Sequence, residues 1–188
     1  MSVTVANIVV GEATLKLGTN AAATSIATMD AFSDVGATTN GVEISWEPEV
    51  VDIEVDQFGD AAKLIQSKVK VMLKTTLAEG TLTNLTTAWN YASSDIVVTQ
   101  DGASTQTFNF GTQSVYPNEK GIVVTGSAPG SSAAATKTRK FYAKRCVSME
   151  SSMISMKRSE ATMFTVGFRV LPTIADTGYQ YGKIVDAT

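Results

Sequence analysis

The chain alternates between apolar and polar residues over most of its length, which is the pattern of half-buried β-strands. Two segments show it most clearly. From 49 to 56, valine and isoleucine alternate with acidic residues, and from 65 to 77, apolar residues alternate with Lys68, Lys70 and Lys74. The two segments are separated by a short loop, so we expect two long strands that pair as a hairpin.

The same alternation predicts strands elsewhere in the chain. Pro48 lacks the N–H that a central strand would donate, so a bend or a sheet edge is expected there. Two stretches rich in small residues, 18–30 and 126–138, are expected to be flexible loops. The segments predicted as strands are 3–10, 13–17, 42–47, 49–56, 65–77, 95–99, 105–110, 121–125, 139–150 and 161–171.

Opposite charges predict the register of the long hairpin. If it turns at 61–62, Asp56 lies opposite Lys68 and Glu54 lies opposite Lys70. Each cross-strand pair of opposite charge stabilises a sheet by a few tenths of a kcal/mol to about 1 kcal/mol.

One helix is predicted, at roughly 79–91, because the apolar period changes there from two to between three and four. Thr76 and Glu79 have the spacing of a capping box. Gly80 would then lie inside the helix, at a cost of about 1 kcal/mol relative to alanine. The apolar face comprises Ala78, Leu82, Leu85, Trp89 and Ala92, of which Leu82, Leu85 and Trp89 are expected to pack on the core.

Composition indicates a single mainly β domain over 1–188. The 188 residues are 44% hydrophobic and 18% charged, which is enough apolar material for a sizeable core. The net charge of -3 argues against a surface that grips nucleic acid. The N-terminus has no signal-peptide pattern, and no apolar run reaches membrane-spanning length, so we expect folding in a cytoplasm and no membrane anchor.

Catalytic groups are scarce. Histidine is absent, and the chain has one cysteine, Cys146, which we expect to be structural. No phosphate-binding loop, dinucleotide fingerprint or zinc spacing occurs, so no cofactor and no enzymatic activity are expected. Asp52 and Glu54 lie about 7 Å apart on one strand face, within range of a glycosidase pair. A solvated acidic face is the simpler interpretation.

Two charged groups allow further interpretations. The acids could form a calcium site, although their spacing is not that of a calcium-binding loop, so solvated acids are favoured. They are Asp34, Asp52, Glu54, Asp56 and Asp60. A basic strip could be a nucleic-acid patch, but the acidic total favours a solvated strand face or a salt-bridged contact with another subunit. It contains Lys137, Arg139, Lys140, Lys144 and Arg145.

Three segments in order resemble the major tail tube proteins of long-tailed bacteriophages. The first is SDVGATTNGVEISWEPEVVDIEVDQFGD, which is similar to the opening strands of that family. The second is KVKVMLKTTLAEGTLTNLTTAWN, similar to its strand that runs into the single helix. The third is FTVGFRVLPTIADTGYQYGKIVD, similar to its last core strand, loop and short terminal strand. The resemblance covers roughly residues 10 to 186.

The resemblance implies two packed antiparallel sheets, a β-sandwich or partial barrel, with one flanking α-helix. It also implies a structural virion protein that forms stacked hexameric rings, assembled in the host cytoplasm. The rings would make the hollow tail tube through which DNA passes during ejection without specific binding. Implied partners are the tape measure, tail terminator and distal tail proteins.

Two sets of residues are candidates for these roles. The candidates for the lumen wall are Asp52, Glu54, Asp56, Lys68, Lys70 and Lys74. The candidates for the ring-stacking loop are Gln57, Phe58, Gly59, Asp60 and Lys63. The alternatives are a ring-forming terminator, distal tail or secretion-tube protein of the same fold, and a monomeric β-sandwich decoration or binding module.

Overall fold

The computed structural model describes residues 9, 11–54, 56, 61–101, 103–111, 116–130, 137–150, 152–154, 156–174 and 180–187. The elements in chain order are β1 (Thr14–Thr19), η2 (Asn20–Ala22), α1 (Ile26–Asp30), β2 (Ser33–Asp34), β3 (Thr38–Glu54), β4 (Ala61–Leu77), α2 (Leu82–Ala88), η3 (Ser93–Asp95), β5 (Ile96–Asp101), β6 (Ala103–Phe108), β7 (Lys120–Ser127), β8 (Thr138–Ser148), β9 (Phe164–Val170) and β10 (Lys183–Ala187).

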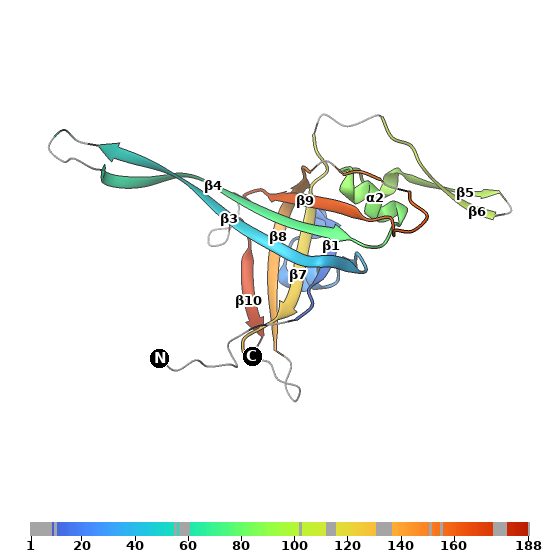
Figure 1. Ribbon diagram of the computed structural model, residues 1–188, viewed down its shortest axis with the longest axis horizontal. Coiled ribbons are helices and arrows are strands. Elements are labelled where there is room, and N and C mark those ends of the chain that lie inside the picture. The colour runs from blue at the N-terminus through green and yellow to red at the C-terminus, as the bar shows by residue number, and fades with distance from the viewer. Residues whose placement is uncertain are drawn as a thin grey trace.

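An eight-stranded antiparallel sheet forms the body, in the order β2-β1-β7-β8-β9-β4-β3, with β10 paired to β8. β8 bridges the two halves of this sheet, because its first residues pair with β10 and its last residues pair with β9. The two halves fold over one another around β8 (Figure 1). A second sheet contains only the β5–β6 hairpin. The mainly β fold with two antiparallel sheets is therefore confirmed.

The main core lies between the two halves of the large sheet. Alternate residues of each strand face inward, which is the reason the period-two pattern is visible in the sequence. The first half contributes Leu15, Ile122, Val124, Phe141 and Ala143, and the second half contributes Val71, Leu73, Leu77, Phe164, Val166, Phe168 and Val170.

The segment 18–30, expected as a flexible loop, contains η2 and α1. Ser25 caps α1 by accepting a hydrogen bond from the backbone N–H of Thr28, and the Thr28 hydroxyl accepts one from the Ser25 N–H. Met29 is buried from this helix against the outer face of β7 and β8. The sequence signal for α1 was this capping box, which is hard to recognise because small residues surround it. In the second expected loop, 126–138, β7 continues to Ser127, and 131–136 lie outside the described residues.

Phe32 packs on two glycines that face each other across strands. Gly18 of β1 pairs with Gly121 of β7. A Cβ on Gly18 would lie 2.4 Å from the Phe32 ring, and one on Gly121 would lie 2.7 Å from it. The absence of side chains at both positions lets the ring cover the sheet.

We expect Gly121→Ala to lower the free energy of unfolding by about 1–3 kcal/mol, because overpacking forces the ring or the strand to move. Gly80→Ala is the control, since its Cβ would meet nothing nearer than 3.6 Å. Urea denaturation measures both. Equal stabilities of the two variants would contradict the tight packing of Phe32.

The helix α2 is shorter than expected and turns a different face to the core. Thr81, not Thr76, is its N-cap, and its hydroxyl accepts from the Asn84 N–H. The capping box from Thr76 to Glu79 is wrong, because Thr76 lies in β4 and the Glu79 carboxylate accepts from the Ala37 N–H instead. Gly80 precedes the helix, so it carries no helix penalty.

The buried face of α2 is largely polar. Asn84, Thr86, Thr87 and Ala88 are buried, whereas Leu85 and Trp89 are half-buried against the core and Leu82 is half-buried without joining it. The Asn84 amide donates to the carbonyls of Val35 and Glu79 at 2.9 and 3.0 Å. The prediction that Leu82, Leu85 and Trp89 form the buried face is therefore wrong in part. Leu85 and Trp89 pack on the core, but the most buried positions of the helix are three polar residues and Ala88.

Trp89 joins the second hairpin to the body. Its ring lies 5.5 Å from Phe110 and 6.2 Å from Phe108, centroid to centroid. We expect Trp89→Ala to lower the free energy of unfolding by about 2 kcal/mol, which is less than the loss of a fully buried tryptophan would cause. It should also speed hydrogen exchange of the backbone amides in β5 and β6. The control is Trp46→Ala, which removes an exposed ring and should cost under about 1 kcal/mol. Equal costs would contradict this placement.

Candidate assembly surface and a lysine pocket

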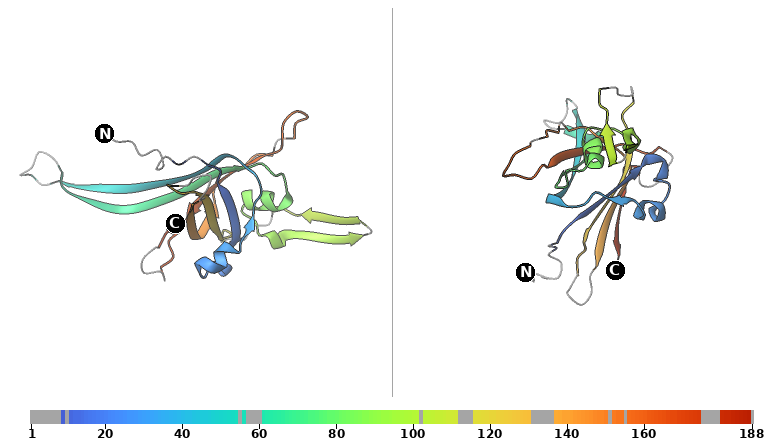
Figure 2. Two further views of the ribbon diagram at one scale, coloured as in Figure 1. Left: turned by 90° about the horizontal axis from the view of Figure 1, so that it is seen from below. Right: turned by 90° about the vertical axis from the view of Figure 1, so that its right-hand side faces the viewer.

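β3 and β4 form a hairpin that extends well beyond the body, referred to here as the arm (Figure 1). Both strands have 17 residues, and a strand of that length spans roughly 55 Å. The β5–β6 hairpin extends in the opposite direction, and both directions are visible in a second view (Figure 2). β3 is the last strand of the sheet, which confirms the expectation of an edge at Pro48. The segments predicted on either side of Pro48 are one continuous strand.

Apolar side chains are exposed along the arm. Trp46 is 60% exposed and Leu64 is 64% exposed. They belong to a larger set of exposed apolar residues on the two strands: Ile44, Trp46, Val50, Val51, Ile53, Leu64 and Ile65. A monomer gains nothing from placing apolar surface on both strands of a projecting hairpin, and such surface is typical of an interaction site.

The predicted register of the hairpin is wrong. Glu54 pairs with Ala61 and Asp52 with Leu64, so no lysine lies opposite either acid. Because β4 begins at Ala61, the turn comes earlier than the centre at 61–62 that the charges suggested. Register irregularities near Glu49 and Ile53 shift the pairing further.

The lysines instead pair with earlier acids of β3. Lys70 Nζ lies 3.2 Å from a carboxylate oxygen of Glu47, and Lys68 Nζ lies 3.6 Å from one of Glu49. Both pairs are exposed and contribute little to stability. Lys74 Nζ donates to Glu150 at 3.0 Å, and this bond raises the pKa of Lys74.

Side chains alternate along β3, so Asp52 and Glu54 lie on the opposite side of the arm from Glu47 and Glu49. The six lumen candidates are therefore split. Lys68, Lys70 and Lys74 share the face of their strand that carries the glutamate partners, and Asp52 and Glu54 lie on the other face, with Asp56 exposed at the following turn. Of the stacking-loop candidates, Lys63 is exposed and pairs with Ile53, and Gln57, Phe58, Gly59 and Asp60 lie outside the described residues.

The basic strip is largely neutralised within the chain. Arg139 Nε lies 2.7 Å from Asp186, and Lys140 Nζ lies 2.9 Å from Asp30. The remaining members, Lys137 and Lys144, also have interaction partners. These contacts within the chain favour a structural role for the strip over phosphate binding.

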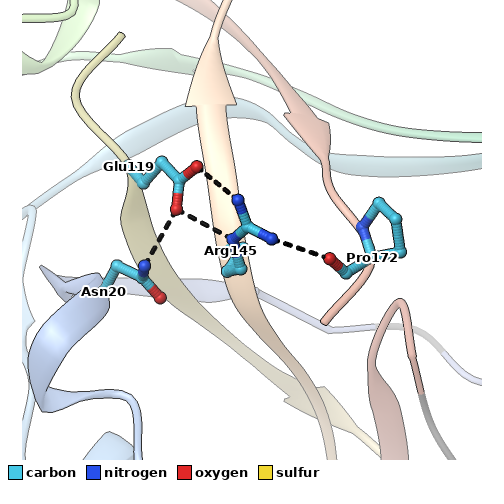
Figure 3. A network of polar contacts seen from close by, with 4 residues as sticks. All are labelled: Asn20, Glu119, Arg145 and Pro172. Carbon is cyan, nitrogen blue, oxygen red and sulfur yellow. Dashed lines mark hydrogen bonds and ion pairs between the residues drawn. The ribbon is translucent and has the colours of Figure 1, made fainter. Parts of the chain in front are cut away.

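Arg145, the last member of the strip, organises a polar network at the end of β7 and β8 (Figure 3). Its guanidinium donates to both carboxylate oxygens of Glu119, at 2.8 and 2.6 Å, and to the Pro172 carbonyl at 3.0 Å. The Asn20 amide donates to the same carboxylate at 2.8 Å. The hydrogen bond from Arg145 lowers the pKa of Glu119. Both oxygens of this carboxylate accept hydrogen bonds from neighbouring side chains.

Lys120, the residue after Glu119, is partly buried and lines a pocket of about 380 Å³ between α2, β1 and β2. Its ammonium donates to the Thr87 hydroxyl at 2.9 Å. Burial lowers the pKa of Lys120 from its ordinary 10.5 to about 8, and no nearby carboxylate offsets this effect. The sequence pattern of β7 does not indicate this pocket, because Lys120 has the position of an ordinary polar residue at the start of a strand.

A more open hollow lies between the end of α2 and the end of β8. Trp89 and Phe110 form one side of it. The buried oxygens Asn90 Oδ1, Glu150 Oε2 and Ser152 Oγ line it, and none accepts a hydrogen bond from another described residue. Acceptors of this kind bind water or a hydrogen-bond donor.

The other chemical candidates do not come together. Asp34 lies in β2, where its carboxylate accepts from the Gly36 N–H at 2.9 Å, whereas Asp52 and Glu54 belong to the arm and Asp60 lies outside the described residues. Among the described residues no group of three or more histidine, cysteine or acidic residues could hold a metal ion. Cys146 is buried, and burial raises the pKa of its thiol, which is consistent with the structural role expected of it.

Within the described ranges, no helix has the length and apolar character needed to cross a membrane. No family model matches the chain, and no curated protein matches it in sequence. The geometry is therefore the basis for a functional conclusion.

Proposed function

We propose that this protein is a structural subunit of a phage tail tube, which forms hexameric rings that stack around an open lumen. The observation that carries the proposal is the arm. It projects from a β-sandwich, exposes apolar side chains on both strands, and ends the sheet with a 17-residue edge strand. Long apolar edges favour pairing with another chain, and an assembly that closes on itself satisfies them.

The shape of the molecule favours a head-to-tail contact. The arm and the β5–β6 hairpin point in opposite directions (Figure 2), so the surfaces that two copies offer each other are different. Heterologous contacts produce rings when the rotation closes and filaments when it does not. A stack of rings combines a contact that closes within each ring with a contact that repeats from one ring to the next.

The charges of the arm favour its lysine-bearing face as the wall of the lumen. A DNA conduit should hold few unpaired cations, because each phosphate contact releases counterions and retards the duplex. The lysine face of the arm meets this condition, since Lys68 and Lys70 are matched by Glu49 and Glu47. Asp52, Glu54 and Asp56 are then free for contacts between subunits.

A monomeric binding module is the second candidate. Phe110 is 69% exposed and Tyr116 is 81% exposed near the second hairpin, and exposed aromatic side chains are typical of binding surfaces. Such a module does not need apolar residues along both strands of a long arm, and a ring-forming terminator, distal tail or secretion-tube protein would share that arm. We therefore place assembly first.

Light scattering of the purified chain over a concentration series tests the proposal. We expect the mass to reach that of a hexamer or of longer assemblies, and the emission of Trp46 to shift to shorter wavelength as its ring becomes buried. A mass equal to one chain at the highest concentration reached would favour the binding module.

A further inference from the structure

One lysine and three acidic residues that lack an ionic partner among the described residues lie at opposite ends of the molecule. Lys120 is partly buried beside α2 and makes no ion pair among the described residues. At the far end of the arm, Asp52, Glu54 and Asp56 are exposed, and none makes an ion pair in the part of the chain described. The projecting end of the arm and α2 lie on opposite sides of the body (Figure 1), so these groups cannot meet within one chain.

The pocket around Lys120 offers an incoming carboxylate one cation and several hydroxyl groups. Its one cation is Lys120, and the hydroxyls of Ser33, Thr83 and Thr87 add hydrogen-bond donors. Two acids also line it: Glu119 is ion-paired with Arg145, whereas Asp34 makes a neutral hydrogen bond, which it accepts from the Gly36 N–H. A volume of about 380 Å³ admits a side chain and excludes a folded segment.

We propose that the Lys120 pocket is a carboxylate-binding site, filled in the assembled protein by an acidic side chain from the arm of a second copy. The inference rests on the proposed function, because it needs two copies in contact. The acceptor and the donor lie on opposite ends of the chain, so each copy offers both, and the contact repeats from one copy to the next.

The site gives assembly a dependence on pH. Lys120 loses its proton near pH 8 in the free chain, and only the charged form attracts a carboxylate. The ionisable groups that line the pocket with it are the carboxylates Asp34 and Glu119, and the hydrogen bond from Arg145 lowers the pKa of Glu119. Association should therefore weaken as the pH rises from about 7 to about 9.

A double-mutant cycle tests the contact. One variant is Lys120→Met, which keeps the length of the side chain and removes the charge. The other combines Asp52→Asn, Glu54→Gln and Asp56→Asn. We expect each to weaken association by about tenfold or more, since each leaves a buried charge without its partner. The control is Lys157→Met, an exposed lysine paired with Glu160. Sedimentation velocity gives the dissociation constants, and circular dichroism checks the fold.

The combined variant decides the outcome. If it is no weaker than the worse of its two parents, the two groups act on each other and the inference is supported. Additive losses would show that another group fills the pocket, which would overturn it, and so would normal assembly of Lys120→Met. In these two cases the proposed function stands. A parent chain that stays monomeric would overturn both.

Discussion

A chain in which residues 50–67 are replaced by Asn-Gly should fold as a monomer and no longer assemble. Glu49 and Lys68 are paired across the arm, so a two-residue turn between them continues the ladder. The deletion removes exposed apolar residues such as Leu64 and Ile65, and the main core lies elsewhere. Circular dichroism and thermal melting should match the parent within a few degrees, and sedimentation should give one species of monomer mass.

The control for the deletion is Met156→Ser, which removes an apolar side chain that is exposed outside the arm. It should assemble as the parent does. Rings or tubes from the deleted chain would contradict the role of the arm, and loss of assembly in both variants would mean that general surface hydrophobicity, rather than the arm, drives association.

Lys120→Met should raise the free energy of unfolding by about 2 kcal/mol at pH 7. The lowering of the pKa from 10.5 to about 8 corresponds to a penalty of roughly 3 kcal/mol for the buried charge. The substitution also removes the hydrogen bond to Thr87, and this loss lowers the free energy of unfolding by about 1 kcal/mol. The substitution should therefore stabilise the fold even though it weakens assembly.

The pH dependence of this gain has a definite sign. Between pH 8 and 10.5 the unfolded lysine stays protonated while the folded one does not, so the parent becomes more stable with rising pH. The advantage of Lys120→Met should shrink over that range. Urea denaturation in the arm-deleted chain keeps the measurement unimolecular, and comparing the two chains cancels the titration of other groups. A difference that stays constant from pH 7 to 10 would contradict the burial of this charge.

Strands were predictable from the sequence because one face of each is buried and the other is not. Phe164, Val166, Phe168 and Val170 all face the core, as their spacing requires. The long hairpin was recognisable for a different reason, since its alternation continues where no core exists. Nothing in the pattern separates a strand that packs on its own chain from one that projects.

Three features depended on information that the local pattern lacks. The register of the arm follows from where the turn begins and from irregular pairing near Glu49 and Ile53, which charge matching cannot place. The face of α2 follows from hydrogen bonds of Asn84 to backbone groups distant in sequence. The pocket around Lys120 exists only because β1, β2 and α2 meet there.

Electron cryo-microscopy of the purified chain tests the central claim most directly. The account predicts rings with sixfold symmetry that stack into tubes, an open lumen, and the arm of each copy in contact with a neighbour. A homogeneous population of single copies, with arms that touch nothing at concentrations where tail components assemble, would contradict it.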